Sequence, residues 1–140
     1  MNRLVCMNCI YAFTLLRVAL GLNIGLHGLV RVKNGPALFV RGIRDEFKSS
    51  GIPGWLLTGF ANTLPYAELF IGMALTIGLA TNAVLLAGCI LMLMLLLGKS
   101  LVADWQVVTF QMIYILIYCT LLAGLHYNSF SADVFIGSNP

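Results

Sequence analysis

Three ionisable side chains, those of Arg17, His27 and Glu68, lie within long apolar stretches of the sequence. An ionisable group inside a membrane is costly, so each of these side chains needs a partner or a purpose. A quinone needs hydrogen-bond donors for its carbonyls and protons for its reduction, and an imidazole and a carboxylate can relay protons. These residue types fit a quinone or proton site. They fit equally well a pair that only neutralises a buried charge.

The apolar stretches also contain uncharged polar residues at helical spacing. Asn23 precedes His27 by one helical turn, and Gln111 and Tyr114 share a face of a later apolar stretch. The alternative interpretation is that Gln111 and Tyr114 form polar seams between helices. The pattern identifies no catalytic residue and no metal site. The residues that we expect to line a quinone cavity are Arg17, Asn23, His27, Glu68, Gln111 and Tyr114.

A Cys-x-x-Cys pair, Cys6 and Cys9, lies near the start of the chain. This spacing is typical of thiol redox sites and of half a zinc site. No histidine follows Cys9, so we expect no covalently attached haem. In an oxidising compartment the pair could drive thiol-dependent quinone reduction, and the alternative is an incidental pair of thiols. Cys89 and Cys119 lie inside apolar stretches, where cysteine is more often a small packing residue.

The composition indicates which elements must position these residues. Of the 140 residues, 60% are hydrophobic and 9% are charged, against roughly 25% charged in a soluble domain. A soluble globular protein is therefore excluded. At about 20 apolar residues per crossing, the chain has enough for four spanning helices. We predict an all-α integral membrane four-helix bundle in a single domain, with spans at 10–30, 55–80, 83–98 and 105–125.

A short amphipathic helix over 37–48 is predicted to lie in the membrane interface between the first two spans, because apolar and basic residues alternate there at helical spacing. Six of the eight Lys and Arg residues flank one side of the predicted bundle. The positive-inside rule places that side in the cytoplasm and both termini on the outer, periplasmic side. The same rule accounts for the net charge of +3, so no nucleic-acid partner is expected.

The first two spans are predicted to pack through small residues. Gly21 and Gly25 form a GxxxG pattern, which allows close approach of a second helix, and Glu68 shares a face with Gly72. Antiparallel packing of these faces is expected to place Glu68 at about the level of Asn23, within a turn of His27 and a turn or more from Arg17. If Glu68 only neutralises a buried charge, its partner is expected to be Arg17 or His27. Residues 126–140 are expected to form a short polar tail.

Four segments resemble the DoxX family of small four-helix bacterial membrane proteins, including its DoxD-like members. They are LLRVALGLNIGLHGLVRV from Leu15, PYAELFIGMALTIGLAT from Pro65, GKSLVADWQVV from Gly98 and HYNSFSAD from His126. Arg17 and Glu68 match the arginine and the acid of that family. The resemblance implies a four-helix bundle in a bacterial cytoplasmic membrane. For the best-described members it also implies a membrane subunit of quinone-linked sulfur oxidation, notably of thiosulfate:quinone oxidoreductase.

Two classes of function follow as hypotheses. The first is a membrane subunit of quinone-linked electron transfer, with a quinone as its cofactor. The second is a non-catalytic accessory or structural subunit of a larger membrane redox complex, in which the polar groups hold the bundle together. The expected partners are membrane lipid and either other membrane subunits or further copies of the chain.

Overall fold

Long apolar segments separated by glycine, proline and polar turns fold into an all-α structure. The computed structural model describes the backbone of residues 2–137 and the side chains of residues 7–137. The helices are α1 (Asn2–Lys33), α2 (Pro36–Glu46), α3 (Gly54–Ile77), α4 (Thr81–Leu101), α5 (Trp105–Ala123) and α6 (Ala132–Ile136), with a 3-10 turn at Leu125–Tyr127. Four of them are long and apolar enough to cross a membrane: α1 over Met7–Lys33, α3, α4 and α5. The predicted four-helix bundle is confirmed, and the chain is a multi-pass membrane protein with four candidate spans.

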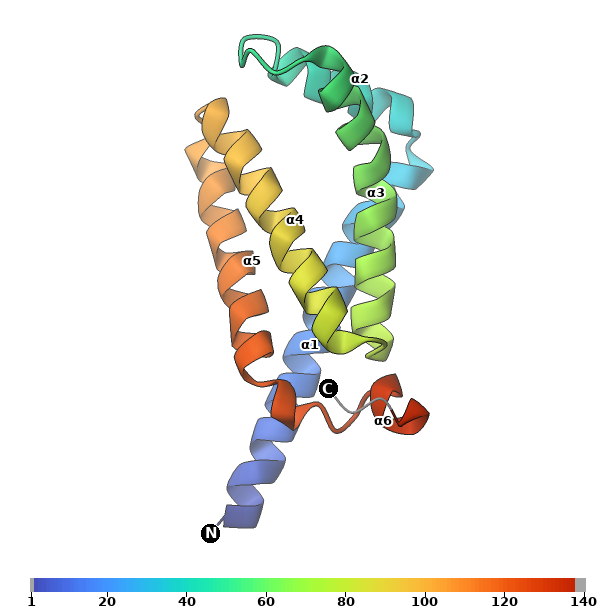
Figure 1. Cartoon of the computed structure of the whole chain (residues 1–140), viewed down its shortest axis with the longest axis vertical. Helices are drawn as coiled ribbons and strands as arrows, with labels where there is room; N and C mark the ends of the chain where they lie inside the picture. The colour runs from blue at the N-terminus through green and yellow to red at the C-terminus, as the bar shows by residue number, and fades with distance from the viewer. Residues whose placement is uncertain (1, 138–140) are drawn as a thin grey trace.

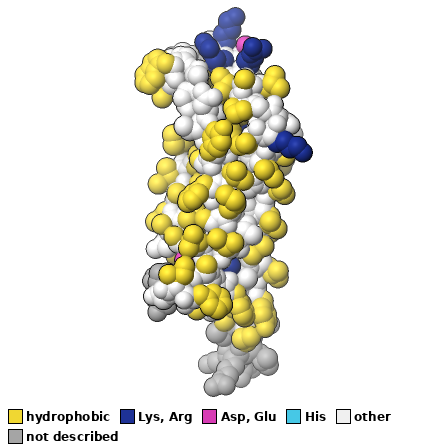
Figure 2. Space-filling model, turned by 90° about the vertical axis from the view of Figure 1, so that its right-hand side faces the viewer, with side chains coloured by type: hydrophobic (Ala, Val, Ile, Leu, Met, Phe, Trp, Pro, Cys, Tyr) yellow, Lys and Arg dark blue, Asp and Glu magenta, His cyan; other side chains and the backbone are white. Residues whose placement is uncertain are grey.

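The bundle consists of two antiparallel pairs, α1 with α3 and α4 with α5 (Figure 1). Helices α3 and α4 meet at their short connecting turn and diverge toward the opposite end, where α2 lies (Figure 1). Hydrophobic side chains cover the length of the face in Figure 2, and Lys and Arg gather at the α2 end. This distribution is the one expected for a bundle surrounded by lipid with one basic interface.

Helices α1 and α3 touch through glycines, as predicted. A Cβ atom at Gly72 would lie 2.2 Å from the backbone nitrogen of Gly25, and one at Gly28 would lie 2.6 Å from the carbonyl oxygen of Pro65. Only glycine leaves room for such contact between the two backbones. Helix α3 continues through Pro65 without a break near Asn62.

The prediction that Glu68 is level with Asn23 is wrong, because the two helices pack in a different register, but Glu68 does lie close to His27, as predicted. Gly25 lies against Gly72, and Gly28 lies against Leu69. Glu68 is therefore level with the last turns of α1 instead of with Asn23. This register decides which basic side chain can reach the carboxylate.

The segment expected to be a polar tail folds back onto the bundle. The carboxylate of Asp133 accepts hydrogen bonds from the backbone N–H groups of Ala80 (2.6 Å) and Thr81 (2.8 Å), and Asn128 donates to the hydroxyl of Thr81 at 3.1 Å. Burial acts to raise the pKa of Asp133, but the hydrogen bonds from Thr81 and Ala80, together with the charge of Arg17, hold it below its usual range. Asp133 thus caps the start of α4 from a distant part of the sequence.

Candidate functional site

A buried ion pair joins α3 to the end of α1. The side chain of Glu68 is 4% exposed, and both of its carboxylate oxygens accept hydrogen bonds from Nη1 of Arg31. The guanidinium carbon of Arg31 also lies 4.8 Å from the centroid of the Phe39 ring of α2, a cation–π contact. The expectation that Glu68 pairs with Arg17 or His27 is therefore wrong. The register of α1 against α3 brings Arg31 to it instead.

His27 lies one turn before Arg31 on the same stripe of α1. It is close enough to Glu68 to interact with it electrostatically, yet its side chain is exposed on the outside of the bundle. No hydrogen bond involves the His27 side chain within the described part of the chain. His27, Asn23 and Arg31 line a shallow hollow together with Leu26 and Val30.

Asn23 connects this hollow to a second one between α1 and α5. The Tyr114 hydroxyl donates a hydrogen bond of 2.9 Å to Oδ1 of Asn23. The apolar side chains around this pair come from both helices: Leu16, Ala19, Leu20, Phe110, Ile113 and Ile117. We call the two adjoining hollows the α1–α5 groove. Its walls are apolar, and its polar side chains are those of Asn23, Tyr114, His27 and Arg31.

Arg17 lies elsewhere in the bundle. Its guanidinium donates to the carbonyl oxygens of Leu75, Thr76 (3.3 Å) and Phe130 (2.7 Å). At 1.5 Å per residue, Arg17 is about 21 Å along α1 from Arg31. The structure therefore does not bring Arg17 together with Glu68. Instead, Arg17 connects the end of α3 to the C-terminal segment.

Gln111 is buried inside the bundle and does not line the groove. Its side-chain oxygen and the Tyr118 hydroxyl are buried without a hydrogen-bond partner among the described residues. Tyr118 packs directly on α4, where a Cβ at Gly88 would lie 2.4 Å from the hydroxyl. The Tyr118 hydroxyl therefore belongs to the seam between α4 and α5.

Sequence reasoning did not identify Arg31 as a site residue. The signal that could have identified it is its spacing of four residues from His27 and eight from Asn23, which places all three on one stripe of the helix. Of the six predicted residues, the structure brings Asn23 and Tyr114 into direct contact and places His27 near Glu68. Gln111 and Arg17 lie apart from these two pairs.

Cys9, Cys89 and Cys119 are free thiols. Among the described side chains, no group of three or more His, Cys, Asp or Glu residues could hold a metal ion. The side chain of Cys6 lies outside the described residues, so the Cys6 and Cys9 pair remains a prediction. Cys89 of α4 and Cys119 of α5 are close enough to interact with each other.

Taken together, the four long apolar helices and the few buried polar groups define a small multi-pass membrane protein of the four-helix-bundle type. Comparisons with protein-family models, with curated proteins and with solved structures found no match.

Proposed function

We propose that the chain is a DoxX-like membrane subunit of quinone-linked electron transfer and that the quinone binds in the α1–α5 groove. The observation that carries this proposal is a shallow, mostly apolar groove on the outside of the bundle whose lining also includes hydrogen-bonding side chains. A quinone dissolves in the bilayer and can enter such a groove sideways. Ligand sites of this kind are mostly apolar, with a few placed polar groups that fix orientation.

The spacing of the polar groups suits a molecule with two carbonyls at opposite ends of a ring. Asn23 and His27 are one turn apart, about 6 Å along the helix axis. Because Oδ1 of Asn23 already accepts the Tyr114 hydroxyl hydrogen, the Asn23 amide N–H groups are left to donate to a ligand. The imidazole of His27 is the second donor.

Reduction of a quinone to a quinol takes two electrons and two protons. His27 carries an exchangeable proton into the groove, and the Glu68 carboxylate, within its electrostatic reach, is a second group that can accept a proton. In this proposal the electrons come from a partner subunit or a small-molecule donor. The four DoxX-like segments support the same function, in a bacterial cytoplasmic membrane with both termini on the outer side.

The test uses side chains that face the groove, because their removal leaves the packing between α1 and α3 intact. We expect Asn23→Leu and His27→Leu each to weaken retention of an added ubiquinone analogue by about tenfold, the loss of one hydrogen bond in an apolar site. Asn62→Leu is the matched control, since Asn62 is exposed on α3 away from the groove. Unchanged quinone retention and reduction in both groove variants, with the folded protein intact, would reject the proposal.

One observation favours the second candidate, a non-catalytic accessory subunit. Both oxygens of Glu68 are already occupied by Arg31, and Arg17 already donates to three carbonyl groups. Such internal pairing is what a purely structural role requires. An accessory subunit is favoured if Glu68→Gln changes the assembly of a larger complex, seen by native mass spectrometry of source membranes, while quinone reduction persists.

A further inference from the structure

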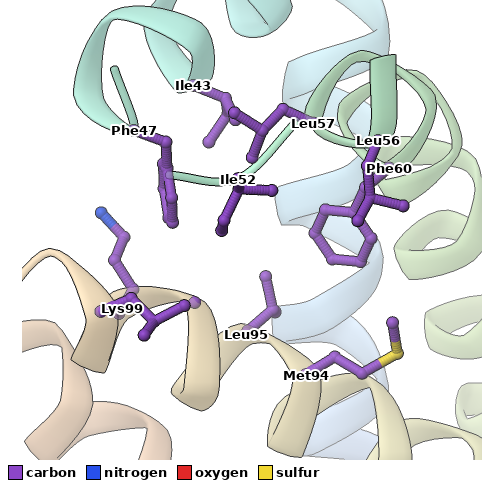
Figure 3. A pocket seen from close by; sticks show the side chains of 11 residues that line it. Ile43, Phe47, Ile52, Leu56, Leu57, Phe60, Met94, Leu95 and Lys99 are labelled. Atoms are coloured by element: carbon purple, nitrogen blue, oxygen red, sulfur yellow. The ribbon is translucent and has the colours of Figure 1, made fainter. Parts of the chain in front are cut away.

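A separate cavity lies at the α2 end of the bundle, where α3 and α4 diverge. Figure 3 shows apolar side chains around it from α2 and the segment that follows, from α3 and from α4, among them Phe47, Phe60 and Leu95. Lys99, at the edge, is the one charged side chain of its lining. The volume is about 230 Å³, against roughly 30 Å³ for one water molecule. The space is therefore apolar and large enough for a run of several methylene groups.

A basic face lies next to this cavity on the other side of α2. Arg41, Arg44 and Lys48 surround a shallow hollow together with Asp45. Among the described residues no ion pair involves any of these three cations. Figure 2 shows Lys and Arg side chains gathered at this end of the molecule. With three cations and one carboxylate, the basic face carries a net positive charge.

The chain places the cavity and the basic face side by side. Arg44 follows Ile43 and Lys48 follows Phe47, and both of these apolar residues line the cavity. The amphipathic α2 therefore turns its apolar side to the cavity and its basic side outward, as a helix in a membrane interface does. Lys99 differs from the three cations, because it pairs with Glu46 and with Asp104 (3.2 Å).

We propose that the cavity and the basic face together bind one anionic glycerophospholipid. One acyl chain occupies the cavity between α3 and α4, and the phosphate is held by Arg44 and Lys48. Charge complementarity selects an anionic headgroup over a zwitterionic one, because basic residues at a membrane surface attract anionic lipid. A neutral apolar occupant would make no use of the three cations beside the cavity. The site shares no residue with the α1–α5 groove, so this proposal does not depend on the proposed function.

The experiment is native mass spectrometry of the full chain released from nanodiscs of dioleoyl phosphatidylglycerol or of dioleoyl phosphatidylcholine. We expect one phosphatidylglycerol retained per chain and no comparable phosphatidylcholine. Arg44→Gln and Lys48→Gln should each weaken retention about fivefold, the usual contribution of one basic residue at the surface. Lys33→Gln is the charge-matched control, since Lys33 ends α1 outside the hollow on α2.

A second pair of variants tests the acyl chain. Leu95→Phe adds bulk inside the cavity and should expel the lipid, whereas Leu93→Phe adds the same bulk on an exposed position of the same helix and should not. Unfolding of both variants in a neutral detergent separates lipid loss from misfolding. Equal retention of the two lipids, or retention unaffected by Arg44→Gln with Lys48→Gln, or by a folded Leu95→Phe, would overturn the proposal.

Discussion

The contact between α1 and α3 predicts an asymmetry between two glycines that face each other. A Cβ at Gly72 would lie 2.2 Å from the nitrogen and 2.3 Å from the Cα of Gly25, whereas a Cβ at Gly25 would lie 3.4 Å from the Cα of Gly72. Ordinary contact begins at 3.4 Å. Gly72→Ala therefore forces the helices about 1 Å apart, which forfeits a quarter to a half of the attraction across the seam. Gly25→Ala fits with no movement.

The size of the effect follows from two opposing contributions. Overpacking against backbone atoms, which cannot rotate away, costs about 3 kcal/mol. Replacing a helical glycine by alanine returns about 1 kcal/mol of helix propensity at either position. We expect Gly72→Ala to lower the free energy of unfolding by about 2 kcal/mol, and Gly25→Ala to raise it by up to about 1 kcal/mol.

The assay is unfolding in mixed micelles of a mild detergent and dodecyl sulfate, followed by circular dichroism. Gly59→Ala is the control, because Gly59 lies on the same helix as Gly72 and a Cβ atom at Gly59 would have no neighbour within 4 Å. It should behave like Gly25→Ala. If Gly72→Ala is as stable as Gly59→Ala, the two backbones are not in contact and the register that pairs Arg31 with Glu68 is refuted.

Three further predictions test other parts of the structure. Asp133→Asn should lower the free energy of docking of the C-terminal segment by about 1 kcal/mol and so speed chymotrypsin cleavage at Phe135. Because the pKa of Asp133 is lowered in the folded protein, its stabilising contribution is present above the unfolded pKa of about 3.9 and is lost as the pH falls below that value. The variant should lack this pH dependence. Cys89 and Cys119 interact across α4 and α5, so copper phenanthroline should join them in a chain lacking Cys6 and Cys9, and failure to cross-link contradicts that packing. Ser50→Cys in a cysteine-free chain should react with an impermeant maleimide only in opened cells, and labelling of intact cells would reverse the expected orientation.

The elements could be predicted from the sequence because each depends on local composition. Runs of apolar residues define the four spans, and the alternation of apolar and basic residues defines α2. The glycine faces of α1 and α3 were also predictable, since a GxxxG pattern indicates close approach. The relative depth of the two helices was not predictable, because the residues of a face determine how a helix is rotated about its axis but not how far it is shifted along that axis. The observed shift of α1 along α3 is the reason why Arg31, and not Arg17, reaches Glu68.

The C-terminal segment was unpredictable for a different physical reason. Asp133 stabilises the start of α4 through hydrogen bonds to Ala80 and Thr81, more than fifty positions away in the sequence. Capping by a neighbouring residue has a sequence signature, but capping by a distant one has none. Arg17 likewise donates to Phe130 of that segment. Its burial is thus explained by a connection that no helical pattern indicates.

One face of α1 packs on α3 through glycines, and the opposite face carries His27. Gly21, Gly25 and Gly28 contact α3, whereas His27, two residues beyond Gly25, points about 200° around the helix and is exposed. A histidine facing lipid without a hydrogen bond costs stability and supports no helix contact. If its role is to bind a ligand, His27→Leu should stabilise the ligand-free bundle while weakening quinone retention. If its interaction with Glu68 is structural, the same change should destabilise the bundle, so the sign of the stability change decides between the two proposed functions.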